Sequence, residues 1–160
     1  MNITVIYGSD AGATKAVAAR IAKKIQGKAI DIKSATTADF ESCDLLILGA
    51  PTYGNGDLQS DWEAHIDTLK SADITNKKVA LFGTGDQVNY PESFVDAMGI
   101  LYDHVVEQGG VVVGFTETDG YDYSASTAER DGRFVGLALD QDNQSSKTDK
   151  RITTWISQLT

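Results

Sequence analysis

Short apolar runs alternate with segments of helical periodicity along the whole chain. The runs are typical of β-strands and lie at residues 3–7, 29–32, 43–49, 79–83, 111–115 and 134–139. The third run is apolar at successive positions, as expected of a parallel strand buried on both faces, whereas the second is more polar and is predicted to lie nearer an edge. Repeated β-α alternation predicts an α/β fold in which helices cover both faces of a parallel sheet.

Apolar residues spaced three or four apart between these runs predict four amphipathic helices. The inner faces of these helices carry Val17, Ile21 and Ile25; Trp62, Ile66 and Leu69; Phe94, Met98, Leu101 and Val105; and Ile152, Trp155, Ile156 and Leu159. The second helix is expected to start near Ser60 or Asp61, and Pro91 suits the first turn of the third. Ser146 and Asp149 are spaced for a capping box at the start of the last helix.

A long polar stretch separates the last two strand-like runs. It covers residues 116–133 and is longer than ordinary loops, so it is either functional or has minor structure of its own. We interpret it as an excursion that interrupts the fifth strand position. No repeat or linker divides the chain, and residues 1–160 are therefore predicted to form one domain.

Charge and composition narrow the range of partners. The 14 basic and 23 acidic residues give a net charge of −9, which argues against nucleic acid and anionic membranes because both need cations to neutralise phosphates. It favours encounters with basic protein surfaces. No apolar run is long enough for a transmembrane helix, and the chain enters a strand at once without a signal-peptide pattern, so a cytoplasmic protein is expected. Cys43 is the only cysteine and is predicted to be a small buried hydrophobe rather than a nucleophile.

The loop after the first strand is a candidate phosphate site. Residues 8–14 read Gly-Ser-Asp-Ala-Gly-Ala-Thr and lead into the first helix. A helix N-terminus offers free N–H groups and the positive end of the helix dipole, and the hydroxyls of Ser9 and Thr14 can add donors. Many β-α turns have a similar composition, so an ordinary turn is the alternative interpretation.

Other phosphate and catalytic motifs are absent from the sequence. The loop lacks the Gly-x-x-x-x-Gly-Lys-Ser/Thr pattern of nucleoside triphosphatases and the Gly-x-Gly-x-x-Gly dinucleotide fingerprint. A receiver domain would need an acidic pair where Gly8 and Ser9 stand and an Asp where Ala50 stands. His65 and His104 lie far apart without metal-ligand spacing, and no Ser-His-Asp or Cys-His arrangement is supported. The predicted site has no catalytic or metal-ligating residue.

Two further Gly-rich loops follow the third and fourth strands. Residues 51–57 contain Tyr53, and residues 83–90 contain Tyr90. Because loops at the carboxyl ends of parallel strands border the ligand crevice, two aromatic faces presented there could clamp a flat ring. The alternative is that these tyrosines cap the sheet as part of the core, but their polar, Gly-rich surroundings favour a ring site.

The loops together resemble those of the flavodoxin family, specifically of its long-chain type. The resemblance covers essentially the whole chain and rests on Gly8-Ser9-x-x-Gly12-x-Thr14, Pro51-Thr52-Tyr53-x-x-Gly56-x-Leu58-Gln59-x-Asp61-Trp62, Gly83-Thr84-Gly85-Asp86-Gln87-x-x-Tyr90, Thr118-Asp119-Gly120-Tyr121 and Phe134-Val135-Gly136-Leu137-Ala138-Leu139-Asp140. It implies a doubly wound, three-layer α/β/α sandwich with a five-stranded parallel sheet of order 2-1-3-4-5. The fifth strand would be interrupted by the insertion that separates long-chain from short-chain members.

The resemblance also implies non-covalently bound FMN. The phosphate would be held by Ser9, Asp10, Ala11, Gly12, Ala13 and Thr14. Tyr53 and Tyr90 would flank the isoalloxazine, and backbone groups around Asp86 and Gln87 would contact its pyrimidine edge. The other expected cofactor-binding residues are Pro51, Thr52, Gly54, Asn55, Gly56, Thr84 and Gly85. The chain departs from the family at Ala11, where a hydroxyl residue is usual, and at Tyr53, where long-chain members often have tryptophan.

Charges near the expected ring favour transfer of single electrons. Residues 51–59 and 83–91 contain no Lys or Arg, whereas Asp57 and Asp86 lie there. Reduced flavin is anionic near N1, and each nearby carboxylate would disfavour that anion by about 1–2 kcal/mol at an effective dielectric constant near 20. The neutral semiquinone can donate a hydrogen bond from N5, and the resemblance implies that the Gly54–Asn55 peptide flips its carbonyl toward this group. Glycine and asparagine permit such a flip at low cost.

The resemblance implies a low-potential one-electron carrier rather than an enzyme. Its partners would be redox proteins with basic docking surfaces, such as a flavodoxin/ferredoxin–NADP reductase, and the carrier would be a monomer. The acidic rim expected to steer them consists of Asp57, Asp61, Glu63, Asp67, Glu92 and Asp96. The alternatives are an FMN-dependent NAD(P)H:quinone reductase of the same fold, although Tyr90 would cover the ring face it needs, and a flavin-free interaction module.

Overall fold

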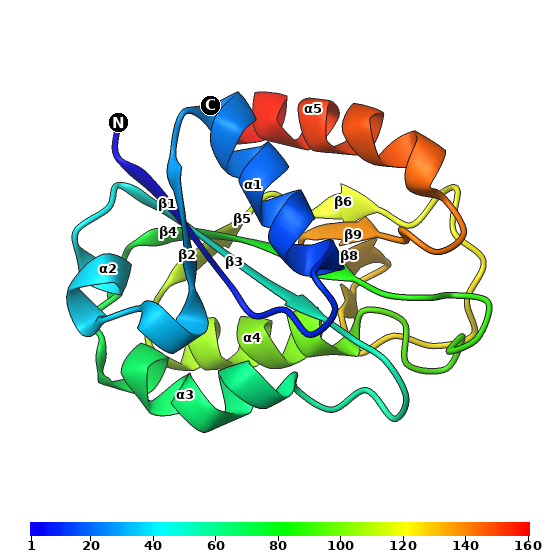
Figure 1. Cartoon of the computed structure of the whole chain (residues 1–160), viewed down its shortest axis with the longest axis horizontal. Helices are drawn as coiled ribbons and strands as arrows, with labels where there is room; N and C mark the ends of the chain where they lie inside the picture. Colours follow the sequence, from blue (N-terminus) through cyan, green and yellow to red (C-terminus); the bar gives the residue numbers. More distant parts are fainter.

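A parallel β-sheet forms the centre of the molecule (Figure 1). The computed structural model describes residues 1–160, and the main sheet has the order β2-β1-β3-β4-β5, with β9 also paired to β4. Its strands are β1 (Ile3–Tyr7), β2 (Lys28–Asp31), β3 (Leu45–Pro51), β4 (Lys78–Thr84), β5 (Val111–Val113) and β9 (Leu137–Leu139). Every pairing in this sheet is parallel, so the predicted fold class and strand order are confirmed.

Helices cover both faces of the sheet. Helices α1 (Ala13–Ile25) and α5 (Thr148–Leu159) lie on one face, and α3 (Ser60–Ser71) and α4 (Asp96–Glu107) lie on the other (Figure 1). All four predicted helices are therefore present, and α3 starts at Ser60 as predicted. None of the helices combines the length and apolarity needed to cross a membrane.

Three short helical segments were not predicted. They are η1 (Ile32–Ser34), α2 (Thr37–Glu41) and η2 (Ser145–Lys147). At five residues or fewer, each is too short for apolar residues to recur over several turns, which is the pattern that predicts a helix. Helix α2 did carry another signal, because Thr36 and Asp39 form a capping box at its start.

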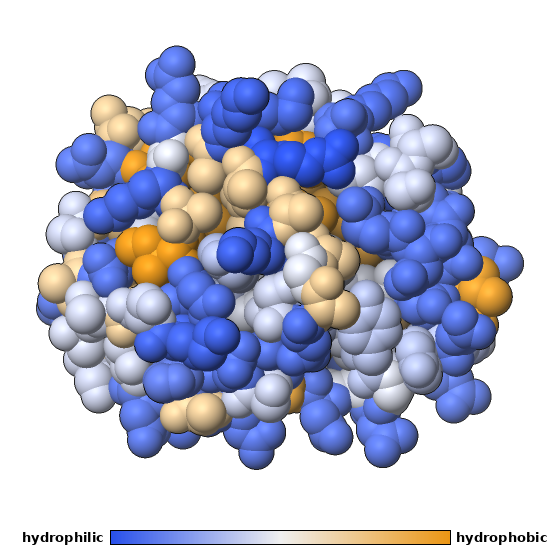
Figure 2. Space-filling view, viewed as in Figure 1, coloured by the Kyte–Doolittle hydropathy of each residue, from blue (hydrophilic) through white to orange (hydrophobic).

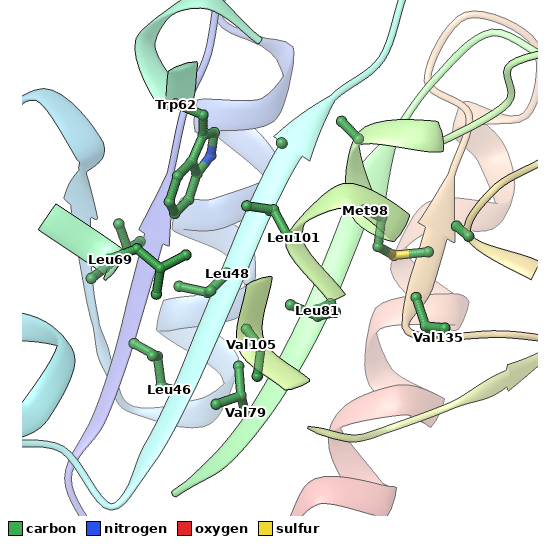
Figure 3. Packing of buried hydrophobic residues seen from close by; sticks show 14 of the residues in the cluster. Leu46, Leu48, Trp62, Leu69, Val79, Leu81, Met98, Leu101, Val105 and Val135 are labelled. Atoms are coloured by element: carbon green, nitrogen blue, oxygen red, sulfur yellow. The ribbon is translucent and has the colours of Figure 1, made fainter. Parts of the chain in front are cut away.

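The hydrophobic core consists of two clusters, one on each face of the sheet. In the larger cluster, alternate residues of β3 and β4 pack beneath α4 (Figure 3). The labelled side chains there are Leu46, Leu48, Val79, Leu81, Met98, Leu101 and Val105. All of them are fully buried, and burial of one such side chain contributes about 1.5–3 kcal/mol. Hydrophilic residues predominate on the surface seen in Figure 2.

The fifth strand position is interrupted, as predicted. Strand β5 pairs with the first half of β4, and β9 pairs with the second half. Between them the insertion forms a small antiparallel sheet of β6 (Thr116–Glu117), β8 (Arg133–Phe134) and β7 (Glu129–Arg130). The single strand predicted at residues 134–139 is therefore wrong. Its first residue belongs to β8, and the chain turns at Gly136, where a Cβ would overlap the Leu81 carbonyl of β4.

Two predictions about helix starts are also wrong. Helix α4 begins at Asp96, so Pro91 lies in the preceding loop, where its carbonyl accepts hydrogen bonds from Ser124 N at 2.7 Å and Ala125 N at 3.0 Å. Those contacts come from the insertion and have no local signal. Helix α5 begins at Thr148 without a side-chain cap, because η2 leads directly into it and Lys147 N donates to the Gln144 carbonyl.

Candidate functional site

Three loops meet at the carboxyl edge of the sheet. Residues 8–12 follow β1, residues 52–59 follow β3 and residues 85–95 follow β4. Since β1, β3 and β4 are adjacent and parallel, their carboxyl ends lie side by side. The loops are joined by hydrogen bonds from Thr52 N to the Thr84 carbonyl (2.8 Å) and from Gln59 Nε2 to Asp10 Oδ1 (2.9 Å). The predicted site residues are thus brought together.

The first loop presents backbone donors at the start of α1. Gly12 is the N-cap residue of the helix; its φ of 96° favours glycine, and it has no side chain to cap the helix. The Ser9 hydroxyl oxygen accepts hydrogen bonds from Gly12 N (3.2 Å) and Lys15 N (3.3 Å), so it orders the loop. The N–H groups of Ala13 and Thr14 have no acceptor within the chain. This end of α1 can therefore receive an anion.

Thr14 and Thr52 have structural contacts that the sequence did not indicate. The Thr14 hydroxyl is buried and shares a 2.9 Å hydrogen bond with the Thr84 hydroxyl. Thr52 is also buried, and its hydroxyl accepts from Ala97 N (2.8 Å) in the first turn of α4. Both side chains therefore hold the loops to each other or to a helix.

Tyr53 and Tyr90 lie together at the rim of this edge. Their ring centroids are 6.0 Å apart and their planes meet at 78°, an edge-to-face contact. Both are partly exposed, at 42% and 37%. A flat ring between two parallel aromatic faces needs about 7–8 Å between them, since carbon atoms pack at about 3.5–4.0 Å. One tyrosine must therefore rotate and move outward to form such a clamp.

The first ring loop is the segment of residues 52–59 that carries Tyr53, and it contains two glycines at positive φ. Gly54 has a φ of +66°, and a Cβ added there would meet open space. Gly56 has a φ of +86°, and a Cβ added there would overlap the Asp96 carboxylate. The Gly54 carbonyl accepts a 2.7 Å hydrogen bond from Ser93 Oγ. The orientation of the Gly54–Asn55 peptide therefore depends on one hydroxyl of the neighbouring loop.

The second ring loop is the segment of residues 85–95 that carries Tyr90, and the buried carboxylates of Asp86 and Asp140 anchor it. Asp86 accepts hydrogen bonds from Val88 N, Asn89 N and Asn89 Nδ2 at 2.8–3.1 Å. Burial disfavours its charged form, but these bonds and one from Asn143 Nδ2 more than compensate and lower the pKa of Asp86. Asp140, which is 0% exposed, accepts from Gln87 N (3.1 Å) and Gln87 Nε2 (2.8 Å). The side chain of Gln87 is thereby fixed.

Sequence reasoning missed residues 140–143 as part of this edge. Asn143 Nδ2 donates to both Asp86 and Asp140. Burial raises the pKa of Asp142, and the carboxylates of Asp86 and Asp140 raise it further. Burial raises the pKa of Tyr53, and Asp142, Asp86, Asp140 and Asp10 raise it further. The signal was available, because residue 140 follows β9 just as the ring loops follow β3 and β4.

The expected acidic rim is only partly present. Asp57, Glu63, Asp67 and Glu92 are exposed and Asp61 is half-buried. Asp96 is buried and accepts a 2.8 Å hydrogen bond from Thr127 N of the insertion, so its place in the rim was wrong. Its burial raises its pKa. Asp96 is the first residue of α4 and has no local signal of burial in the sequence, so only the packed insertion shows that it points inward.

Comparison with known proteins identifies relatives over the whole chain. Residues 5–155 match the family model described as Flavodoxin. A curated flavodoxin of Synechocystis sp. is 46% identical, with 98% of this chain and 95% of the relative covered. A flavodoxin of Helicobacter pylori is 42% identical, with the same coverage of each chain.

Solved structures have the same fold. The structure of Fusobacterium nucleatum flavodoxin bound to flavin mononucleotide matches with a TM-score of 0.93 and 37% identity, covering 99% of this chain and 96% of that one. Oxidised flavodoxin 1 of Bacillus cereus matches with a TM-score of 0.74 and 28% identity, covering 99% and 97%. On the family model and on relatives above 40% identity, this chain belongs to the flavodoxin family.

Proposed function

We propose that residues 1–160 act as one domain that binds FMN non-covalently and carries single electrons between redox proteins. The observation that carries this proposal is the meeting of an anion-binding helix start and two tyrosine-bearing loops at one sheet edge, in a chain whose relative of known structure binds flavin mononucleotide. FMN supplies stepwise one-electron reduction. The protein is an electron carrier rather than an enzyme, as are the flavodoxins it matches.

The residues present suit the phosphate of FMN. Residues 9–14 would hold it through the free N–H groups at the start of α1, with the Ser9 hydroxyl free to donate while its oxygen orders the loop. Asp10 lies in this loop, but Gln59 Nε2 binds its carboxylate and draws it toward α3. The absence of a hydroxyl at Ala11 leaves more of the binding to the backbone.

The ring would lie between Tyr53 and Tyr90 once their edge-to-face contact opens. Stacking on aromatic side chains is worth about 1–3 kcal/mol per ring. The backbone of Thr84, Gly85, Asp86 and Gln87 would contact the pyrimidine edge, because the side chains of Asp86 and Gln87 are already bound within the protein. Pro51, Thr52, Gly54, Asn55 and Gly56 would complete the ring site.

Carboxylates dominate the electrostatics of this edge. Besides burial, Asp86 and Asp140 raise the pKa of Asp142, and these three carboxylates raise the pKa of Tyr53. Residues 51–59 and 83–91 contain no cation. Uptake of the second electron, which would leave a negative charge near N1 of the ring, would therefore be disfavoured, and the fully reduced protein would be a strong reductant. The low-potential step follows from this surplus of negative charge.

The partners are redox proteins, as the family implies. We expect them to present basic docking surfaces, because Asp57, Glu63, Asp67 and Glu92 are exposed around the ring loops. A flavodoxin/ferredoxin–NADP reductase would be of this kind. The carrier would act as a monomer in the cytoplasm, and its encounter rates would fall as salt concentration rises.

Anaerobic stepwise reduction of the purified protein tests this proposal. The expected result is a yellow protein that releases FMN on extraction and passes through a one-electron-reduced form with its own visible absorbance. A colourless protein whose apo form does not bind FMN at micromolar concentrations would overturn it. Rapid NAD(P)H consumption by the protein alone would instead support a reductase.

A further inference from the structure

A second pocket lies away from the ring loops, between α5 and the insertion. Its volume is about 550 Å³, within the range of roughly 300–1,000 Å³ typical of small-molecule sites. In Figure 1, α5 passes above β9 and β6, whose residues form the floor and far wall of this groove. None of its lining residues belongs to the three FMN loops.

The floor of the groove is apolar and its polar atoms are already paired. Trp155 is buried, and its indole N–H donates to the Gly114 carbonyl at 2.8 Å. Burial raises the pKa of Tyr121 to about 12 against the opposing effect of Arg151, so its hydroxyl stays neutral and donates to the Ala138 carbonyl at 2.5 Å. Leu137 and Trp155 are themselves buried, at 3% and 1% exposed, so the apolar surface that faces the groove comes from the partly exposed Phe115 and Tyr121.

Three cations line the helix side of the groove. Lys147, Lys150 and Arg151 are spaced i, i+3 and i+4, which places them on one side of the start of α5, where the helix dipole is positive. The Arg151 guanidinium carbon lies 4.1 Å from the centre of the Tyr121 ring, and Nη1 donates to Gln144 Oε1 at 2.8 Å. This guanidinium is therefore held in place.

These cations have no carboxylate partner in a protein rich in carboxylates. The ion pairs of the chain use Arg20, Lys33 and Arg130 instead. The chain has 23 acidic and 14 basic residues, so a cluster of three cations without ion pairs is not the expected arrangement. A fixed positive group at the edge of an apolar floor is suited to an anion with a hydrophobic body.

We propose that this groove binds a small amphipathic monocarboxylate. Its apolar or aromatic body would lie on the partly exposed Phe115 and Tyr121, above the buried Trp155, and its carboxylate would be bound by Arg151 and Lys150. Glu117 and Asp119 stand on the opposite wall and would repel a second negative group, which selects ligands with a single anionic head. The site requires neither FMN nor its loops.

A titration of the ¹⁵N-labelled FMN-loaded protein with 2-naphthoate tests the site, with neutral 2-naphthylmethanol as the matched ligand. The Trp155 indole N–H signal is expected to move and saturate, whereas that of Trp62, which is bound to the Gly49 carbonyl on the other face of the sheet, stays in place. The alcohol should bind at least tenfold more weakly. Equal affinity for the two ligands, or no saturable shift at Trp155, would overturn the proposal.

Variants separate the pocket from general surface charge. The double substitution Lys150→Gln/Arg151→Gln should weaken the binding of 2-naphthoate at least tenfold. The control substitution Lys23→Gln/Lys24→Gln, on the exposed side of α1, should leave the affinity for 2-naphthoate unchanged. Thr154→Trp, at an exposed lining position, should abolish binding by filling the groove while flavin absorbance is retained. Equal weakening by both double substitutions, or full binding by Thr154→Trp, would refute the site.

Discussion

The two ring loops meet at the same sheet edge but are held in different ways. The first contains Gly54 and Gly56 at positive φ, is exposed near its tip and has one side-chain bond to its Gly54 carbonyl, from Ser93. The second is fastened by Asp86 and Asp140, both buried and each accepting several hydrogen bonds. The comparison indicates that the first loop can change a peptide orientation at low cost, while the second holds its backbone donors in a fixed position.

Removal of the Asp140 carboxylate, which anchors the second ring loop, is expected to cause the largest loss of stability. Asp140→Ala leaves both donors of the buried Gln87 without their acceptor, and we expect a loss of about 3 kcal/mol in the free energy of unfolding. Chemical denaturation of the apoprotein measures it. Asp142→Ala, at an exposed carboxylate, is the control and should change stability by less than about 0.5 kcal/mol. A similar loss of stability in both variants would contradict the conclusion that Asp140 anchors the second ring loop.

Substitutions of the two glycines of the first ring loop should destabilise the protein by different amounts. Gly56→Ala adds strain at φ +86° and a Cβ that overlaps the Asp96 carboxylate, so we expect about 2 kcal/mol of destabilisation and weaker FMN binding. Gly54→Ala adds the backbone strain alone, about 1 kcal/mol, because the new Cβ would contact no other atom. Denaturation and FMN titration of both variants compare them. An equal cost would show that the contact with Asp96 is easily relieved.

Substitutions at Ser93 and at Gly54 should change the cost of the Gly54–Asn55 peptide flip in opposite directions. Ser93→Ala removes the hydroxyl that holds the Gly54 carbonyl, worth about 1 kcal/mol, so the peptide should flip more readily and the one-electron-reduced form should persist over a wider range of potentials. Gly54→Val should make the flip costlier and narrow that range. Anaerobic titration with visible absorbance measures both, and Ser124→Ala, at an exposed position of the insertion, is the control. An unchanged range in both variants would contradict the flip.

The smallest expected effect is the contribution of the buried Asp96 to the pH dependence of stability. Burial raises the pKa of this carboxyl above 3.8, so the stability it contributes is fully present below pH 3.8 and is lost as pH rises through the folded-state pKa. Asp96→Asn keeps an oxygen to accept from Thr127 N and cannot ionise. The variant should therefore gain stability relative to the parent as pH increases above about 4. Denaturation at pH 4, 5 and 7 checks it, and a constant difference would exclude the effect.

Local patterns carried most of the fold prediction. The third strand-like run and the helix marked by Val17, Ile21 and Ile25 have periods that belong to one kind of element, and both are present with small shifts at their ends. Predictions failed where a distant segment decides the outcome. Pro91 is bound by the insertion instead of starting α4, and the run at 134–139 is divided because Gly136 lies against the Leu81 carbonyl.

The sequence by itself determined the alternation of strands and helices, the three loops at strand ends and the surplus of negative charge, because each depends on residue type and spacing. Only the tertiary structure decided that Asp140 anchors Gln87, that Ser93 holds the Gly54 carbonyl and that Asp96 faces inward. These contacts join residues 31–53 positions apart. A hydrogen bond between such distant positions leaves no periodic trace in the chain, since its partners become neighbours only when the sheet and its loops are assembled.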